Sequence, residues 1–373
     1  MNKSDLTRDY LMLSKHNKKG YDWWWHSFTG ICEKTGKEKP FYVEFYITNP
    51  GLNTPKPQFG QSSQGSTRPC YIMMNVGTWG ENPRQLHNFY PISELKSKAD
   101  ELSLTFGGNS LSETSTKGKV ELSKADAKNH PEYMSDAGCI SWDLTIDKQI
   151  AFNVGYGANR TFRTMNSFEM FWHAEGMKTQ YSGEVILDGE KYIVSPETSY
   201  GYADKNWGKD FTSPWLWIAT SDIYSQTHQK KLNNTALDIG GGCPKAFGIP
   251  FNKKLLAQFT YEGEDLEFNF SKLLSGTHNA FTFTEKDKNK ITWNIVLKNK
   301  EYELVCIVSC DKKDTLFINY ESPNGKKLHN HLWNGGNATG TLVLHKIDKQ
   351  KNVTILDVMT FKHGGCEYGE YNK

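Results

Sequence analysis

Long apolar runs are absent from this chain of 373 residues. No window approaches the roughly 20 consecutive apolar residues of a transmembrane helix, and residues 1–25 contain no apolar core of signal-peptide length. The sequence therefore predicts a cytoplasmic protein without a transmembrane segment. On this expectation the sequons NRT, NNT and NAT carry no information, because N-glycosylation requires secretion.

Net charge and paired cysteines are also scarce. The 44 Lys and Arg residues nearly balance the 42 Asp and Glu residues, for a net charge of +2. Without a long basic run, no nucleic-acid partner is expected, because phosphate binding needs clustered Lys and Arg. The seven cysteines include no Cys-x-x-Cys pair, which is typical of reduced, buried thiols. Cys306 and Cys310 lack a nearby second pair, so no structural zinc is expected there.

Helical patterns are few, and strand patterns fill most of the chain. Segment 138–147 alternates and places Ile140, Trp142, Leu144 and Ile146 on one face. The best helical pattern, at 92–103, is short and polar. Four hairpins are predicted, at 181–197 with an Asp-Gly turn, 254–270, 290–310 and 339–365.

Many short antiparallel strands with closely spaced turns are typical of β-barrels and β-sandwiches. At roughly 150 residues per domain, the length fits two domains. We therefore expect an all-β protein of two tandem antiparallel barrel or sandwich domains, 1–195 and 196–373, with few short helices. Segment 49–69 is rich in Pro, Gly and Ser and too long for a hairpin turn, so it is predicted to be a flap-like loop at a pocket rim.

Aromatic residues are abundant, at 13%, and several stand beside ionisable groups. In YGYADKNWGKDF (200–211), an extended backbone places Tyr200, Tyr202, Asp204 and Asn206 on one face and Lys205 and Trp207 on the other. The same alternation in NSFEMFWHAEG puts His173 and Glu175 on one face and Trp172 on the other. Trp215 and Trp217 share a face of SPWLWIATSDI. The WWW run (23–25) must present rings on both faces, so one face borders the core and the other a pocket or an interface.

An acid held against indole rings loses hydration, which raises its pKa. Such an acid stays protonated near neutral pH and can donate a proton. Asp204 is therefore a candidate general acid. Two structural alternatives remain open: Asp204 and Lys205 form a solvated ion pair at a strand end, and His173 is a hydrogen-bonded core histidine.

The stretch YGYADKNWG resembles the Tyr-x-Glu-Lys-Asn-Trp-Gly signature of the tocopherol cyclase family. The segments FTSPWLWIATSDI, LDIGGGCPKAFGIPFNKKLLAQFTYEGEDLEF, GGNATGTLVLHKI and ILDVMTFKHGGCEYGEY are similar to later segments of that family. GYDWWWHSFTG and PFYVEFYITNPG resemble its opening strand pair. The resemblance covers roughly residues 20–365.

This resemblance implies a calycin-like (lipocalin-like) double β-barrel, an architecture shared with carotenoid 1,2-hydratases. It implies an apolar unsaturated substrate in a pocket within or between the β domains. Tocopherol cyclase protonates a prenyl double bond, and the phenol oxygen then closes the chromanol ring without a metal or organic cofactor. By this resemblance Asp204 occupies the position of the family's Glu and is the acid, Lys205 holds a substrate oxygen or tunes Asp204, and Asn206 orients either group.

The combined interpretation is a cofactor-independent cyclase or isomerase that acts by acid catalysis on a prenylated or polyene substrate. The candidate catalytic residues are Asp204, Lys205, Asn206, His173, Glu175 and Glu197. The candidate substrate-binding residues are Trp25, Trp172, Tyr200, Tyr202, Trp207, Trp215, Trp217, His331 and Trp333. Alternatives are a non-catalytic carrier of a hydrophobic ligand, a hydratase that adds water to a double bond, and a protein that stacks tryptophans on a sugar. The sequence does not indicate an oligomeric state.

Two further motifs carry weaker interpretations. In KKLHNHLWNGG, His329 and His331 share a strand face, but a metal site needs a third ligand such as His345 or His363. The alternatives are a polar strand rim or, for His331 and Trp333, a pocket mouth. IGGGCP lacks the helix and the Lys-Ser/Thr of a phosphate loop and is predicted to be a glycine-rich barrel turn.

Overall fold

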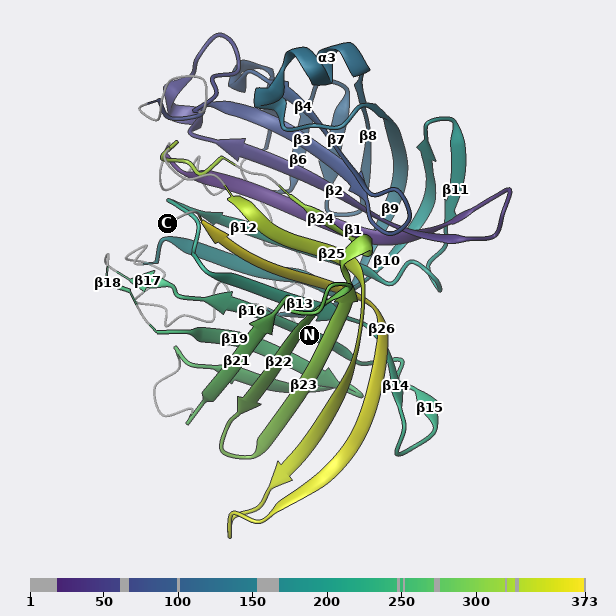
Figure 1. Ribbon diagram of the computed structural model, residues 1–373, viewed down its shortest axis with the longest axis vertical. Helices are drawn as coiled ribbons and strands as arrows, with labels where there is room; N and C mark the ends of the chain where they lie inside the picture. Colours follow the sequence, from purple (N-terminus) through teal and green to yellow (C-terminus); the bar gives the residue numbers. More distant parts are fainter. Residues whose placement is uncertain are drawn as a thin grey trace.

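A computed structural model describes residues 19–60, 67–98, 101–152, 168–246, 249–250, 252–271, 276–318, 321–325 and 329–371. Nearly all regular structure is antiparallel β-sheet (Figure 1). Within these residues the single α-helix is α3 (Lys124–Asn129), capped by Ser123, whose side chain accepts a hydrogen bond from the backbone N–H of Asp126. The predicted all-β class with few short helices is confirmed. None of the helices in the described ranges is long and apolar enough to span a membrane.

The first sheet has 12 strands in the order β4-β3-β2-β1-β11-β10-β9-β8-β7-β6-β5, and β12 pairs with both β1 and β10. β4 also contacts β8 and β9, so the sheet curls around one apolar cluster that draws on most of its strands. The strands are β1 (Tyr21–Cys32), β2 (Glu38–Thr48), β3 (Tyr71–Thr78), β4 (Arg84–Tyr90), β5 (Lys96–Ser97), β6 (Ser103–Phe106), β7 (Asn109–Ser112), β8 (Ser115–Leu122), β9 (Gly138–Phe152), β10 (Met170–Leu187), β11 (Glu190–Val194) and β12 (Gly201–Gly208).

The second sheet also has 12 strands, with the main order β20-β19-β16-β13-β26-β25-β23-β22-β21. β19 contacts β21, which closes this sheet around a second apolar cluster. Its strands are β13 (Trp215–Thr220), β14 (Asp222–Ser225), β15 (Lys230–Lys231), β16 (Ala236–Gly242), β19 (Lys254–Tyr261), β20 (Glu264–Asn269), β21 (His278–Thr284), β22 (Lys290–Lys298), β23 (Tyr302–Asp311), β24 (Thr315–Phe317), β25 (His329–Ile347) and β26 (Val353–Tyr371). The short strands β17 (Lys245–Ala246) and β18 (Ile249–Pro250) form a separate pair.

The four predicted hairpins are confirmed as β10–β11, β19–β20, β22–β23 and β25–β26. Two of them turn at residue pairs with positive φ, Asp188-Gly189 (49° and 87°) and Glu262-Gly263 (46° and 92°). Glycine at the second position suits this turn geometry because it has no Cβ. The predicted face of β9 is also confirmed, since Ile140, Trp142, Leu144 and Ile146 are all buried.

The prediction of a helix from the pattern at 92–103 is wrong. That segment begins with the 3₁₀ turn η3 (Ile92–Glu94) and continues into the edge strand β5. Ile92 and Leu95 pack against the core and Leu102 is buried in it, just before β6 begins at Ser103, so the described apolar residues serve the edge strands and not a helix face.

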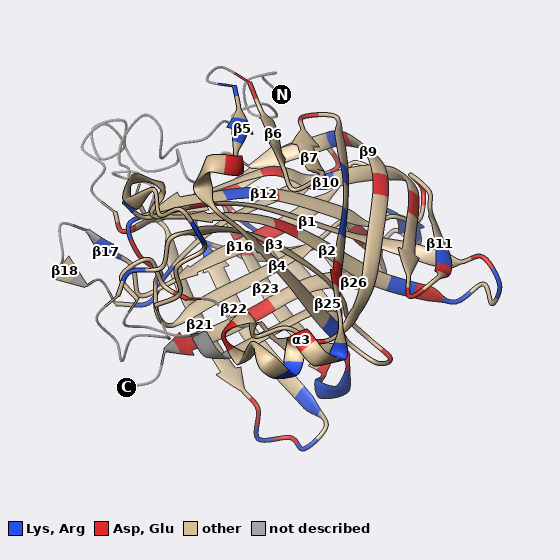
Figure 2. Cartoon of the chain, turned by 90° about the horizontal axis from the view of Figure 1, so that it is seen from above, with Lys and Arg blue, Asp and Glu red and all other residues tan. Residues whose placement is uncertain are grey.

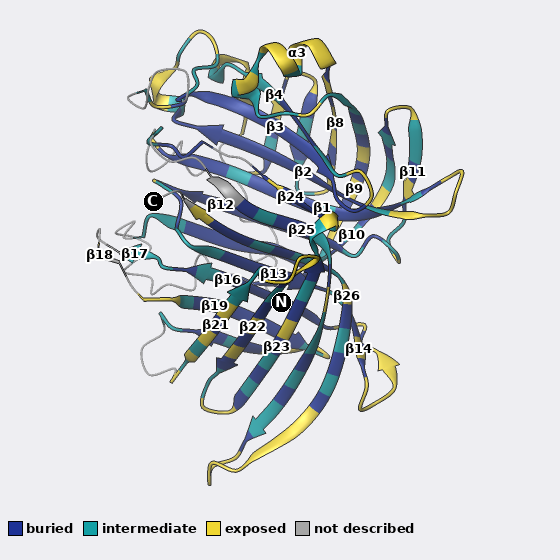
Figure 3. Cartoon of the chain, viewed as in Figure 1, coloured by how far each residue is buried: buried dark blue, intermediate teal, exposed yellow. Residues whose placement is uncertain are grey.

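A third apolar cluster lies between the two sheets. From the first sheet it takes Tyr21, Trp25, Tyr42, Tyr46 and Trp79, and from the second Trp217, Ala219, Ala236 and Leu332. Figure 3 shows the facing strands of both sheets as buried, with exposed residues at the outer loops and hairpin ends.

Charges of both signs are scattered along loops and strands (Figure 2). The chain passes from the first sheet to the second between Gly208 and Trp215, while the division into domains at 195/196 stays a prediction.

Candidate functional site

The strand β12 contains the stretch YADKNW and runs through the middle of the first sheet, between β1 and β10. Asp204 lies opposite Trp25, and Lys205 lies opposite both Trp24 and His173. Because paired residues share a face, Asp204 points to the layer between the sheets with Trp25. Lys205 points to the interior of the first sheet with Trp24. The predicted alternation is therefore confirmed within β12, where every residue is buried. It does not extend to Tyr200, which precedes the strand and has a positive φ of 44°.

Asp204 is surrounded by neutral hydrogen-bond donors. Its Oδ1 accepts a bond from Trp23 Nε1 (3.3 Å), and its Oδ2 accepts bonds from Trp172 Nε1 (3.0 Å) and the Tyr202 hydroxyl (3.2 Å). Burial raises the pKa of Asp204 to about 7, although these three bonds and the charge of Lys205 oppose the increase. The side chain is therefore a carboxyl group that holds or releases a proton near neutral pH.

Two more acids approach Asp204 from the second sheet. The Tyr202 hydroxyl is 3.1 Å from Oδ2 of Asp238 in β16, and burial together with the charge of Asp204 raises the pKa of Asp238 well above its ordinary value. Glu367 in β26 accepts a bond from Asn334 (3.3 Å). Burial, followed by the charge of Asp204, raises the pKa of Glu367 to about 8. The layer between the sheets thus collects acids that favour their protonated forms.

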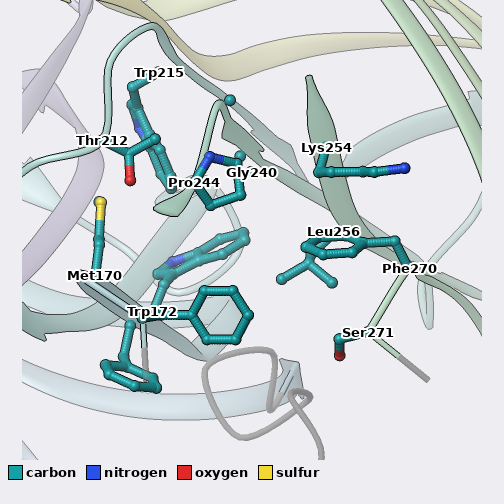
Figure 4. A pocket seen from close by; sticks show the side chains of 14 residues that line it. Met170, Trp172, Thr212, Trp215, Gly240, Pro244, Lys254, Leu256, Phe270 and Ser271 are labelled. Atoms are coloured by element: carbon teal, nitrogen blue, oxygen red, sulfur yellow. The ribbon is translucent and has the colours of Figure 1, made fainter. Parts of the chain in front are cut away.

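The Trp172 indole, which donates to Asp204, also lines an apolar pocket. Figure 4 shows this pocket and the Trp172 ring in its wall. This pocket encloses about 580 Å³ of empty space, its open mouth included. Trp172 and Trp215 form part of its wall and meet edge to face, with ring centroids 6.2 Å apart. The remaining lining is mostly apolar and consists of Phe168, Met170, Phe171, Thr212, Gly240, Gly241, Gly242, Pro244, Lys254, Leu256, Phe270 and Ser271.

The glycines of IGGGCP contribute to this pocket from within a strand. Gly240–Gly242 end β16, so the predicted glycine-rich turn is wrong. A Cβ on Gly240 would lie 2.4 Å from the Trp172 ring, and Gly241 has φ +146° with Lys254 O 2.2 Å from its would-be Cβ. The strand lacks side chains here because the Trp172 ring and the neighbouring backbone occupy the space.

A second pocket is lined by Tyr202. It has about 360 Å³ of empty space, its open mouth included, and is lined by residues that include Trp79, Tyr200, Tyr202, Thr220 and His363. Tyr200 stacks on His363 with ring centroids 3.9 Å apart. Two of the three side chains that donate to Asp204 therefore line different pockets, Trp172 the first and Tyr202 the second. None of the described residues of the predicted flap at 49–69 lines either pocket.

The opposite face of β12 has a different character. Lys205 is fully buried and forms an ion pair with Asp22, and its Nζ lies 3.8 Å from the centroid of the Trp24 ring. His173 shares this face by register. The structure therefore separates Lys205 and His173 from Asp204, with the backbone of β12 between them.

Some of the other predicted residues lie in the layer around Asp204, and the rest lie elsewhere in the fold. Trp25, Trp172, Tyr202 and Trp217 belong to the apolar layer around Asp204, and Trp215 packs against it. Asn206 accepts a bond from the Tyr21 hydroxyl (2.8 Å) in the same layer. Trp217 and Tyr202 lie side by side, with centroids 4.9 Å apart.

Four predicted residues lie apart from Asp204. Trp207 stacks on Phe171 on the Lys205 face. Glu175 pairs with Lys148 at 3.0 Å, and Glu197 is exposed in the turn before β12. Trp333 is half-buried and donates to Glu285 (2.8 Å). The side chain of His331 lies outside the described part of the chain, as does that of His329, so a metal site at these histidines is not tested. Elsewhere in the described ranges, no three His, Cys, Asp or Glu residues are grouped as metal ligands.

Sequence reasoning missed Asp238 and Glu367. Each is an acid in a strand whose other residues are mostly buried or half-buried, ALDIGGG in β16 and VTILDVMTFKHGGCEYGEY in β26. Asp238 also stands two residues before Gly240 and so shares its face. An acid within an apolar, glycine-rich strand was the available signal.

Three comparisons relate this chain to known proteins. The family model described as "Tocopherol cyclase-like" matches residues 106–370. Among solved structures, kievitone hydratase from Nectria haematococca superposes with a TM-score of 0.47 at 13% sequence identity, over 96% of this chain and 91% of the hydratase chain. No curated protein matches the chain.

Proposed function

The chain belongs to the tocopherol cyclase-like family, and on this premise we propose that it is a cyclase or isomerase that protonates a double bond of an apolar unsaturated substrate. The observation that carries the proposal is Asp204, a buried carboxyl with a pKa of about 7 that is hydrogen-bonded to Trp172, a wall residue of the apolar pocket. The proposed chemistry requires a proton donor, an aromatic lining and exclusion of water, and no cofactor.

The apolar pocket suits the hydrocarbon part of such a substrate. Its wall consists mainly of rings and aliphatic side chains, including Phe168, Trp172, Trp215, Leu256 and Phe270. Burial of apolar substrate surface against these groups supplies binding free energy of about 25 cal/mol per Å². Lys254 at the pocket is the cationic group available to a polar substrate end.

In the proposed reaction Asp204 gives its proton to one carbon of the double bond. The neighbouring carbon becomes a cation, and the faces of Trp172 and Trp215 stabilise it, since aromatic rings attract cations. A hydroxyl oxygen of the same substrate then attacks the cation, which closes the ring, and its proton returns to the carboxylate of the site. The atoms of the substrate are rearranged, and the protein ends with the protons it began with.

The test uses a panel of prenylated hydroquinones and polyenes in D₂O. A cyclase product has the substrate's elemental composition and carries one deuterium on the protonated carbon, whereas a hydratase product also gains one water. Asp204→Asn is expected to lower turnover about 10²- to 10⁴-fold and to retain binding. The control is Asp143→Asn, which changes an exposed acid paired with Lys117.

Full turnover by Asp204→Asn contradicts the role of Asp204. Binding of the panel by both the wild-type protein and Asp204→Asn, with turnover by neither, indicates a carrier instead.

A further inference from the structure

The Tyr202 hydroxyl stands between two carboxyl groups from different sheets. Its oxygen lies 3.2 Å from Asp204 Oδ2 and 3.1 Å from Asp238 Oδ2. A phenol has one proton and can donate to only one of these oxygens at a time. The second contact is a hydrogen bond only when the other carboxyl is protonated and donates to the phenol oxygen. All three side chains are buried, so an unprotonated pair would place two uncompensated charges in an apolar layer.

The two carboxyl groups differ in the donors that reach them. Asp204 accepts bonds from the indoles of Trp23 and Trp172 besides Tyr202, which stabilises its anionic form. The Trp217 indole and the backbone N–H of Ile239 also favour the anion of Asp238, but its buried Oδ1 has no donor at hydrogen-bond distance within the described residues. The shared proton is therefore held more firmly by Asp238, while Asp204 is the group that more readily becomes an anion. The raised pKa values agree with this order, since Asp238 lies well above its ordinary value and Asp204 is at about 7.

We propose that Asp238 is the proton reservoir of the site and that the Tyr202 hydroxyl relays its proton to Asp204. The inference rests on the proposed function of Asp204 as the acid. After Asp204 has given its proton to the substrate, Tyr202 passes its hydroxyl proton to Asp204 Oδ2 and takes the proton of Asp238 Oδ2. One O–H bond breaks on Asp238, one forms on Asp204, and tyrosine is unchanged. Because Asp238 holds its proton more firmly than Asp204, this transfer is completed by the strongly acidic proton of the attacking hydroxyl, which is released to Asp238 and restores it.

Other charged groups around this trio affect its titration and enter the design of the test. Glu367, from β26, has a pKa of about 8 and is sensitive to the charges of Asp204 and Glu44. Glu44, from β2, accepts a bond from Asn75 (2.8 Å). Lys205 acts on Asp204 from the opposite face of β12. Glu367→Gln is therefore the background for the titration, because it removes the carboxyl whose pKa lies nearest that of Asp204.

The experiment is an infrared pH titration of the carboxyl C=O stretch, which needs no substrate. In the Glu367→Gln background, one protonated carboxyl is expected to persist after Asp204 has ionised. Adding Asp238→Asn is expected to remove that band. Adding Asp204→Asn is expected to lower the pH at which the Asp238 band disappears, because the charge of Asp204 no longer raises the pKa of Asp238. Adding Tyr202→Phe is expected to raise the pKa of Asp204, because a donor to its anion is lost. A band unaffected by Asp238→Asn overturns the proposal.

Turnover of a prenylated hydroquinone separates this proposal from the one it rests on. Tyr202→Phe and Asp238→Asn are expected to lower kcat about tenfold or more with little change in KM, whereas a merely structural role would affect both constants. If Asp204→Asn is inactive and both relay variants turn over normally, the relay is wrong and the acid stands. If Asp204→Asn keeps full activity, the proposed function itself fails. Tyr202→Phe preserves the ring packed on Trp217, so it tests the relay even if Asp238→Asn does not fold.

Discussion

Asp204 and Lys205 are neighbours in β12, yet their side chains lie in different environments. Lys205 faces the interior of the first sheet, where Asp22 balances its charge and the Trp24 ring covers it. Asp204 faces the layer between the sheets, where only neutral groups donate to it among the described residues. A buried charge with a paired counter-charge remains ionised, whereas a buried carboxyl without one tends to take up a proton. This difference makes one face structural and leaves an exchangeable proton on the other.

The largest effect on stability is expected when the ion pair between Lys205 and Asp22 is broken. Lys205→Met removes the ammonium group that balances the buried Asp22, which is expected to lower the free energy of unfolding by about 3–5 kcal/mol. Adding Asp22→Leu removes both charges and is expected to restore most of that stability, because an apolar pair replaces an ion pair. Urea unfolding at pH 7 measures both. Equal stability of the single and double variants would show that Lys205 does not act through Asp22.

The face of Asp204 is expected to respond to pH in the direction set by its raised pKa. Between its ordinary pKa of 3.8 and about 7, the folded protein keeps a proton that the unfolded chain has released. Stability is therefore expected to fall as the pH rises through this window, by an amount on the order of 4 kcal/mol. Asp204→Asn is expected to reduce the dependence in urea unfolding at pH 4.5 and 7.5, while Asp238 and Glu367 keep their own part of it, and Asp143→Asn is expected to leave it unchanged. A parallel pH dependence of Asp204→Asn and the wild-type protein would contradict the buried, protonated carboxyl.

Two tryptophans of the pocket separate hydrogen bonding from packing. Trp172→Phe removes the N–H that reaches Asp204 Oδ2, so the pKa of Asp204 is expected to rise by about one pH unit or more. Trp215→Phe is the matched control, because Trp215 lines the same pocket and makes no bond to Asp204. The infrared titration measures both variants. An equal change in the pKa of Asp204 in both variants would mean that the effect comes from altered packing of the pocket wall and not from the lost hydrogen bond.

The smallest effect is expected at a contact between the sheets that is built on charge pairing. His363 in β26 lies 2.7 Å from Asp222 and 3.0 Å from Glu38, which belongs to the first sheet. Burial lowers the pKa of His363, but the bonds to both carboxylates outweigh it, so the net pKa is raised. The contribution of protonated His363 to the folding stability is therefore fully present below pH 6.5, the ordinary pKa of histidine, and is lost as the pH rises through the raised pKa of His363.

His363→Asn is expected to lower the free energy of unfolding by roughly 1 kcal/mol at pH 6 and by less at pH 9. Asparagine tolerates the positive φ of 51° at this position, so the comparison reports the charge and not the backbone. His228→Asn, at an exposed histidine, is the control. A loss that is the same at both pH values would mean that the imidazolium does not join the sheets.

The sequence predicted the parts of this protein that depend on local geometry. Alternation with a period of two residues was sufficient to place Tyr202, Asp204 and Asn206 on one face of β12 and Lys205 on the other. Turn chemistry was sufficient to predict the hairpins at Asp188-Gly189 and Glu262-Gly263. Local context was also sufficient to predict that the Asp204 carboxyl lies against indole rings, since aromatic residues surround it in the sequence.

Tertiary structure decided which groups each face meets. Asp22 pairs with Lys205 across 183 residues, and Asp238 reaches Tyr202 only because β16 of one sheet packs on β12 of the other. Alternation specifies that a side chain points away from its neighbour, but it does not specify what lies opposite. The identity of a partner across two packed sheets depends on the register and stacking of strands far apart in the chain, and these are set by the packing of the whole apolar layer.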